Sequence, residues 1–199
     1  MERIFMVPSH AAKQAPPLSM AHWLNTDGPL DLRGMEGRVV VLCAFRMDCR
    51  ESLRHGLPQA ARIREAFDPR DVEVIGMHPV LDQPQAMGAL TLASFLLEYD
   101  VRIPVGLDAR TGSAANDSVL TTMESYGITG TPSLVIIDRQ GCLRAHVLGH
   151  PADMLVGATI ATLVAEKKSR PVVLGRRPRP LTPMDTAFAE GYASHRWQG

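Results

Sequence analysis

Several apolar runs in this chain are short, continuous and rich in β-branched residues. The clearest covers residues 39–45, and residues 133–137 form a second one. Runs of this length without polar alternation are typical of strands buried on both faces of a sheet. Residues 72–77 form a similar run interrupted only by Glu73. The three segments predict the central strands of one sheet.

Between the runs at residues 39–45 and 72–77, apolar residues recur at helical spacing over residues 50–67. Gly56 and Pro58 lie inside that helix, and proline removes a backbone hydrogen bond and clashes with the preceding turn, so the sequence predicts a kink. Strand, helix and strand in this order predict a parallel β-α-β unit with a right-handed crossover. Further helices are predicted over residues 86–99, 118–126 and 151–168.

Shorter elements complete the predicted sheet. Residues 18–32 predict an edge hairpin of two short strands. Residues 101–107 predict a short strand, placed at an edge because Pro104 has no N–H to donate. Residues 138–141 predict a hairpin turn that ends in Gly141, after which residues 142–148 return antiparallel.

Length and composition favour one domain with appendages. The chain has 199 residues, 45% of them apolar, which is enough for one hydrophobic core. We expect an irregular N-terminal arm over residues 1–17, an α/β domain over residues 18–168, and a tail rich in proline and arginine over residues 169–199.

Charge and cysteine content exclude several classes of function. Basic and acidic residues balance at 21 each, so no net field favours nucleic acid or an anionic membrane. No apolar segment approaches the roughly 20 residues of a membrane span, and the N-terminus lacks a signal-peptide pattern. Three irregularly spaced cysteines predict neither a disulfide framework nor a zinc site. We expect a cytoplasmic protein with reduced thiols and without a metal or cofactor.

Cys49 is the candidate for chemistry. It lies between the end of the first predicted strand and the first turn of the kinked helix, where the helix dipole and free backbone N–H groups favour an anion. The anion would be a thiolate, which is a nucleophile. Charged residues of both signs surround it, so the sequence leaves open the net direction of its pKa shift; they are Arg46, Asp48, Arg50, Glu51, Arg54 and His55.

The order of the predicted elements, together with three landmarks, resembles a known family. The landmarks are Cys49 before the kinked helix, Gly130–Thr131–Pro132 before an apolar strand, and the turn at residues 138–141. Residues 18–166 resemble the redoxin branch of the thioredoxin-like superfamily, which includes relatives of alkyl hydroperoxide reductase and thiol-specific antioxidant (AhpC/TSA). The resemblance implies a thioredoxin-like α/β fold: a central mixed sheet flanked by helices, with an N-terminal hairpin and a C-terminal extension.

The resemblance also implies roles for individual residues. Cys49 takes the position of the nucleophilic cysteine. The Thr131–Pro132 bond takes the position of the family's cis-proline loop, which lies against the thiol. The backbone groups of Thr131 would then be free to pair with an extended substrate, and Thr131, Pro132 and Arg50 are the expected substrate-binding residues.

The chain departs from the family at the second active-site position. Ser52 stands where dithiol members have their second cysteine. Its hydroxyl can hold the thiolate or satisfy a backbone donor in the first helical turn, but it cannot form a disulfide. We expect Cys142 at the opposite end of the sheet and Cys43 inside a strand, beyond the reach of Cys49. An outside thiol such as glutathione would therefore resolve the mixed disulfide that Cys49 forms when it attacks a disulfide or a glutathionylated protein or small thiol.

Three alternatives remain open at this level. The first is an inert site left over on an inherited fold, and the second is a non-enzymatic binding module on the same fold. The third is a weak peroxidase that uses Cys49 alone. Against peroxidase activity, peroxiredoxins place threonine or serine three residues before their cysteine and a proline before that, whereas this chain has Arg46 and Leu42. The arm and tail are candidates for a homodimer contact. For His78, which follows a predicted strand, a satisfied loop histidine is the preferred interpretation.

Overall fold

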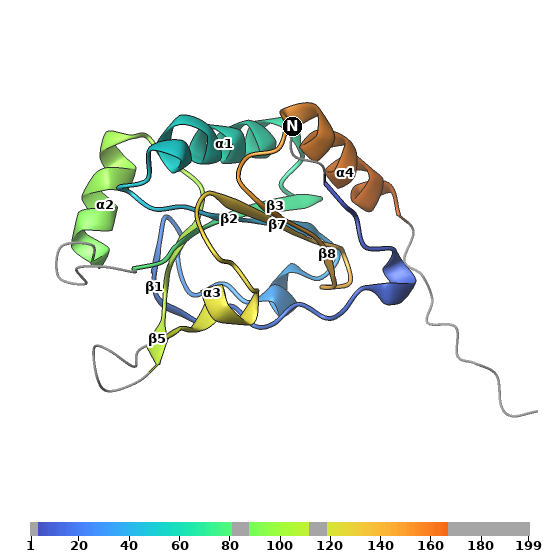
Figure 1. The fold of residues 1–199 in the computed structure, drawn as a ribbon, viewed down its shortest axis with the longest axis horizontal. Coiled ribbons are helices and arrows are strands. Elements are labelled where there is room, and N and C mark those ends of the chain that lie inside the picture. Colours follow the sequence, from blue (N-terminus) through green and yellow to red (C-terminus); the bar gives the residue numbers. More distant parts are fainter. Residues whose placement is uncertain (1–3, 81–87, 112–118, 167–199) are drawn as a thin grey trace, which may run out of the picture. The chain divides into compact units, whose positions relative to one another are not determined.

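A six-stranded mixed sheet forms the centre of the fold in a computed structural model, which describes residues 4–80, 88–111 and 119–166 (Figure 1). The strand order is β1-β4-β3-β2-β7-β8. Strands β2, β3 and β4 run parallel to one another, and β1, β7 and β8 are antiparallel to their neighbours. The bounds are β1 Met20–Leu24, β2 Val39–Ala44, β3 Val72–His78, β4 Val105–Asp108, β7 Ser133–Ile137 and β8 Leu143–Leu148. Strands β5 (Arg110–Thr111) and β6 (Val119–Leu120) form a separate two-stranded sheet.

Helices cover both faces of the sheet, with α1, α2 and α4 on one side and α3 on the other (Figure 1). Alternate residues of β2 point to opposite faces, so Val41 belongs to the same buried cluster as Ile160 of α4, whereas Leu42 belongs to the cluster that contains Met123 of α3. The helices are α1 Leu57–Ala66, α2 Ala89–Glu98, α3 Thr121–Ser125 and α4 Asp153–Ala165; short 3₁₀ turns cover Ser9–Ala11 and Leu32–Met35. This arrangement is the predicted thioredoxin-like architecture, and the parallel β2-α1-β3 unit is confirmed.

The predicted kink takes the form of a π-turn ahead of α1. Residues Ser52–Gly56 form this turn, in which the N–H of Leu57 bonds the carbonyl of Ser52, five residues earlier. Pro58 follows in the first turn of α1, where its missing N–H costs little. The wider turn therefore lets one helical segment run on from Cys49 past the proline.

The predicted N-terminal hairpin is wrong. Met20–Leu24 is a single strand that pairs antiparallel with β4, Leu24 opposite Val105. The chain leaves the strand at Asn25, whose φ of 57° is left-handed. The Asn25 amide donates to the carbonyls of Val101 and Ile103 at 2.7 and 3.1 Å. These bonds tie the segment to the approach of β4, so no second strand returns along β1.

The predicted edge position of residues 101–107 is also wrong, because β4 lies between β1 and β3. Pro104 precedes the strand rather than interrupting it, so its missing N–H removes no hydrogen bond from the ladder. The Pro104 carbonyl even accepts the N–H of Gly76 at 2.8 Å. Proline at the start of a strand is compatible with an interior position.

The N-terminal arm lies along the outer edge of β8. The N–H of Val7 donates to the carbonyl of Arg144 at 2.7 Å, and the N–H of Leu143 donates to the carbonyl of Lys13 at 2.8 Å. Covering an edge strand in this way protects its unpaired backbone groups. The chain divides into two units, Met1–Lys168 and Ser169–Gly199; all described residues lie in the first, and the predicted tail lies outside them.

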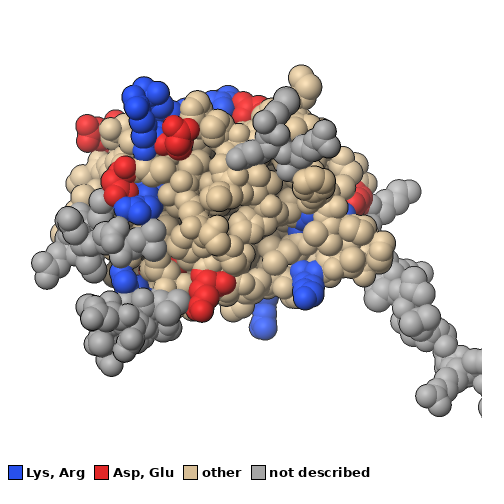
Figure 2. Space-filling view, viewed as in Figure 1, with Lys and Arg blue, Asp and Glu red and all other residues tan. Residues whose placement is uncertain are grey.

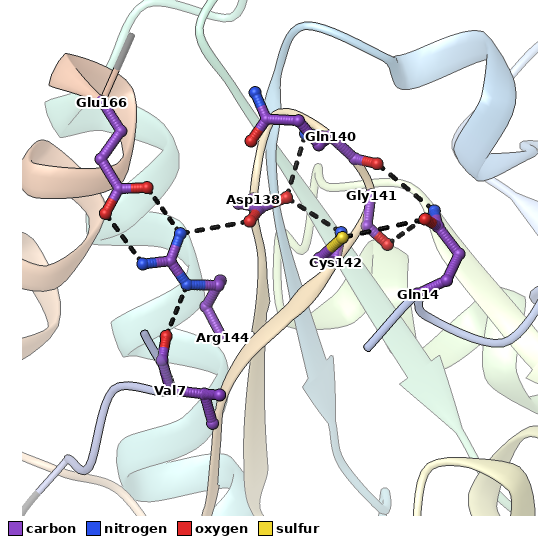
Figure 3. A network of polar contacts seen from close by, with 8 residues as sticks. All are labelled: Val7, Gln14, Asp138, Gln140, Gly141, Cys142, Arg144 and Glu166. Atoms are coloured by element: carbon purple, nitrogen blue, oxygen red, sulfur yellow. Dashed lines mark hydrogen bonds and ion pairs between the residues drawn. The ribbon is translucent and has the colours of Figure 1, made fainter. Parts of the chain in front are cut away.

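A buried ion-pair network joins the arm, the β7–β8 turn and the end of α4 (Figure 3). Arg144 is 1% exposed. Its guanidinium donates to the Val7 carbonyl at 2.7 Å, to Asp138 at 3.1 Å and to both carboxylate oxygens of Glu166 at 2.6 and 2.8 Å. The cation thus has charged partners on two elements, as a buried charge requires.

The surface fits the balanced composition. On the face in Figure 2, acidic and basic side chains are interspersed around a broad area that carries neither. Among the described residues, no helix has both the length and the apolar character needed to cross a membrane.

Candidate thiol site after the central strand

Cys49 follows the end of β2 and opens the helical segment that leads into α1. Its N–H donates to the carbonyl of Arg46 at 3.2 Å, and its carbonyl accepts the N–H of Leu53 at 3.1 Å. The side chain is half-buried. The thiol therefore stands at the start of a helix, where unpaired backbone N–H groups are concentrated.

The cis-proline loop lies against this thiol. The Thr131–Pro132 peptide bond is cis, and the Cys49 Sγ lies 3.3 Å from the Thr131 carbonyl oxygen, to which the thiol donates. Pro132 is buried and Thr131 is half-buried. Among the described residues, the N–H of Thr131 has no hydrogen-bond partner. The loop thus has the geometry that the resemblance implied.

Gly56 allows the helix to approach this loop. A Cβ at residue 56 would lie 2.9 Å from the Cβ of Pro132, closer than two carbon atoms can pack. On its other side, the Pro132 carbonyl accepts the N–H of Gly149 at 2.7 Å. The sequence interpretation noted Gly56 only as a residue inside the predicted helix, because the pattern along one helix gives no sign of a contact with residue 132.

Ser52 hydrogen-bonds both a backbone donor and the thiol, although that donor lies in the loop before the helix rather than in the first helical turn. The side chain is fully buried, and its Oγ accepts the N–H of Arg46 at 3.3 Å. The hydroxyl hydrogen then remains to donate to the sulfur of Cys49, and this hydrogen bond favours the thiolate. Ser52 therefore links the backbone of the loop to the charge state of the thiol.

The pKa of the Cys49 thiol is lowered from its ordinary value. Burial alone raises it, but hydrogen bonds that favour the thiolate outweigh burial. They come first from the side chain and N–H of Ser52, then from the side chain of Thr131 and the N–H of Glu51. The thiol's own bond to the Thr131 carbonyl exists only in the protonated form. Deprotonation therefore frees that carbonyl for a substrate.

The nearby charges contribute less than their number suggests. Arg46 pairs with Asp48 through contacts of 2.9 and 2.5 Å, and this pairing lowers the pKa of Asp48. Arg50 is exposed and has no ion pair with any described residue. Hydrogen bonds, rather than arginines, are thus the main cause of the lowered Cys49 pKa.

The other two cysteines differ from Cys49. Cys43 is buried in β2, and burial raises its pKa to about 12. Cys142 lies beyond the β7–β8 turn, next to the pair formed by Ile137 and Leu143; burial, with help from the Asp138 carboxylate, raises its pKa. All three are free thiols. As predicted, Cys142 and Cys49 lie at opposite ends of the sheet, because Cys49 follows the end of β2 that pairs with the start of β7.

His78 is only half-satisfied, which corrects the preferred sequence interpretation. It is the last residue of β3 and 1% exposed. Its Nδ1 lies 3.1 Å from the Phe45 carbonyl, whereas Nε2 has no partner among the described residues. Burial lowers its pKa. The ring is therefore a neutral donor that braces the segment between β2 and Cys49.

A shallow depression lies between α2 and the loop that precedes Cys49. Its volume is about 400 Å³, and it is lined by Met47 and Asp48 of the Cys49 loop together with Phe95 and Tyr99 around α2. It offers a surface next to the Cys49 loop on which part of a substrate could rest.

Comparison with known proteins decides the family. The family model for AhpC/TSA proteins matches residues 11–146. The chain belongs to the AhpC/TSA family. The match confirms the resemblance to the redoxin branch of the thioredoxin-like superfamily, which was based on the sequence motifs.

Solved structures place this AhpC/TSA protein among thioredoxin-like folds. One thioredoxin-like superfamily protein is 41% identical, with a TM-score of 0.73 over 78% of this chain and 99% of the other. A thiol-disulfide isomerase from Corynebacterium glutamicum is 31% identical, with a TM-score of 0.72 over 79% of this chain and 99% of the other. These relatives support a thiol redox protein as the general kind.

A curated relative is far longer. NHL repeat-containing protein 2 of Gallus gallus is 29% identical over 129 residues, which are 64% of this chain. The match spans 16% of that relative's length.

Proposed function

We propose that this protein catalyses thiol–disulfide exchange through Cys49 alone, with an outside thiol completing the reaction. One observation carries the proposal. A half-buried thiol with a lowered pKa lies 3.3 Å from the carbonyl of the residue before a cis-proline. The nucleophilic sulfur therefore lies next to backbone groups of Thr131 that are open to a substrate.

The reaction is a pair of exchanges that balance in atoms and electrons. The Cys49 thiolate attacks one sulfur of a disulfide, forms a mixed disulfide with it and expels the other sulfur as a thiolate. A second thiolate, such as that of glutathione, then attacks the substrate's sulfur and releases Cys49. The outside thiol is oxidised as the substrate disulfide is reduced. Ser52 stabilises Cys49 both as attacking and as leaving thiolate.

The open groups around the thiol suit a glutathionylated protein or small disulfide. The unpaired N–H and the carbonyl of Thr131 can pair with an extended backbone as an added strand does. The exposed guanidinium of Arg50 suits a carboxylate, which glutathione carries. Such a reaction needs a pool of reduced thiols, so a cytoplasmic location is part of the proposal.

The test measures the peptide thiol that is freed from a glutathionylated peptide, with free glutathione as the resolving thiol and oxidised glutathione as the second product. Wild type should turn over, and Cys49→Ser should abolish exchange. Cys142→Ser is the matched control and should retain full activity, because Cys142 lies at the other end of the sheet. Ser52→Cys should add dithiol reductase activity toward a protein disulfide. Absence of activity in both wild type and Ser52→Cys would overturn the proposal.

Capture of a partner protein distinguishes an enzyme from a binding module. A protein partner captured as a mixed disulfide should be lost in Cys49→Ser if exchange is the function. Binding that survives Cys49→Ser would instead support a recognition module on the same fold.

A further inference from the structure

Three side chains of metal-ligating types meet beside the Cys49 site, and the proposed exchange uses none of them. They are Glu51 and His55 on the helical segment after Cys49, and His150 on the segment between β8 and α4. One potential ligand atom from each lies within 4.8 Å of the others. Residues 99 positions apart in the chain thus come together only through the fold.

The helix places two of the three side chains on one face. Glu51 and His55 are four residues apart, the spacing that brings side chains together on a helix. A Glu51 carboxylate oxygen lies 3.7 Å from the Nε2 of His55. The rings of His55 and His150 face each other, with centroids 4.0 Å apart and planes 5° from parallel.

The backbone around His150 is fixed on both sides. Before it, the N–H of Gly149 donates to the Pro132 carbonyl at 2.7 Å. After it, the buried side-chain amide of Gln59 donates to the Pro151 carbonyl at 2.6 Å and to Asp153 at 2.7 Å. The helix and the cis-proline loop therefore hold the His150 backbone in place, while its ring stays exposed.

We propose that Glu51, His55 and His150 bind a divalent transition-metal ion of the Zn²⁺ class. Two imidazoles and a carboxylate, with a fourth position left for water, form a donor set that Zn²⁺ accepts. Donor atoms around a tetrahedral zinc lie about 3.3 Å apart for bonds of about 2.0–2.1 Å. Binding one ion therefore requires the accessible rings and carboxylate to rotate about their own side-chain bonds, so that the donor atoms reach that spacing and the ring nitrogens turn toward the ion.

The fixed backbone and accessible side chains of the three residues suit metal binding. Ligands held by a rigid frame lose little freedom on binding, which favours affinity. A chance surface contact between two histidine rings would need no such frame on both sides of His150. The site lies on the two segments that flank Cys49, the helix and the loop after β8, yet it is complete without the thiol.

The test is a titration of the full chain with Zn²⁺ by calorimetry, in a Cys49→Ser, Cys142→Ser background that removes the two accessible thiols. Saturable binding of one ion is expected. Losing a partner outside the ligand shell costs about 10–100-fold in affinity, so His55→Ala or His150→Ala should each weaken binding by at least about tenfold. His22→Ala removes an exposed histidine on β1 and is the matched control, which should bind like its parent.

Either of two results would overturn the proposal: no saturable Zn²⁺ binding in the parent, or affinity that is the same in His55→Ala, His150→Ala and His22→Ala. Co²⁺ absorption gives an independent check, since its visible bands report coordination by nitrogen and oxygen ligands. Because Cys49 is absent from every variant, neither outcome depends on whether the protein catalyses exchange.

Discussion

At the hairpin end of the sheet, Asp138, Arg144 and Glu166 direct their polar atoms at one another (Figure 3), whereas at the opposite end Cys49 and Thr131 leave polar atoms open. Both clusters sit where a strand meets a turn. In the first, a charge that is 1% exposed is satisfied entirely by the protein. In the second, the N–H of Thr131 has no partner among the described residues. The first cluster contributes to stability, and the second is open to a ligand.

The cysteines at these two ends show the same difference. Burial, with help from the Asp138 carboxylate, raises the pKa of Cys142. Cys49 receives hydrogen bonds from Ser52, and its pKa is lowered. Sequence position alone does not separate them, because each follows a strand or turn. The local donors and anions decide which thiol ionises.

The largest expected effect is at the hairpin end. Arg144→Ala leaves the buried carboxylate of Asp138 without its cation, and breaking a buried pair by removing one partner costs about 3–5 kcal/mol. Urea unfolding should show that loss in the free energy of unfolding. Cys49→Ser, the comparison at the open end, should change it by about 1 kcal/mol or less, because the half-buried serine hydroxyl can keep the hydrogen bond to the Thr131 carbonyl. Equal losses in the two variants would contradict the assigned roles.

A smaller effect is expected where the helix meets the cis-proline loop. Gly56→Ala places a methyl group 2.9 Å from Pro132, and overpacking of this kind costs about 1–3 kcal/mol. It should also slow exchange by moving Cys49 away from Thr131. Gly157→Ala in α4 is the matched control, because a Cβ there meets nothing within 4 Å. That change should stabilise the helix by about 0.5–1 kcal/mol and leave exchange unaltered. Equal rates in the two variants would show that close helix–loop packing is not needed.

Among the three variants that remove or crowd a contact, Arg144→Ala, Gly56→Ala and Ser52→Ala, the smallest effect on stability is expected for Ser52→Ala. Ser52→Ala removes the acceptor for the Arg46 N–H, at a cost of about 1 kcal/mol because that backbone is only partly buried. It also removes a donor to the Cys49 thiolate, so alkylation of Cys49 at neutral pH should slow several-fold. Ser94→Ala, which alters an exposed serine on α2, should leave the alkylation rate unchanged. An unchanged alkylation rate in Ser52→Ala would show that the Ser52 hydroxyl does not stabilise the Cys49 thiolate.

The sequence predicted those features that depend on neighbours along the chain. The apolar run of β2 and the Cys49–helix junction were predicted because burial and helix starts leave local patterns. The pairing of β1 with β4 was missed, since periodicity shows that a strand exists but not which strand it joins. The contact of Gly56 with Pro132 and the meeting of His55 with His150 were equally invisible. The direction of the Cys49 pKa depended on hydrogen-bond geometry that a list of nearby charges does not contain.

The most direct test of the central claim is the pH dependence of Cys49 alkylation in the folded protein, read peptide by peptide by mass spectrometry with a chelator present. The lowered pKa predicts a midpoint below the free-thiol value of about 8.5. Cys142 should titrate at or above that value in the same sample, and Cys43 should stay unlabelled because it is buried. A Cys49 midpoint at or above that of Cys142, or no labelling of Cys49 in the folded state, would contradict an activated thiolate.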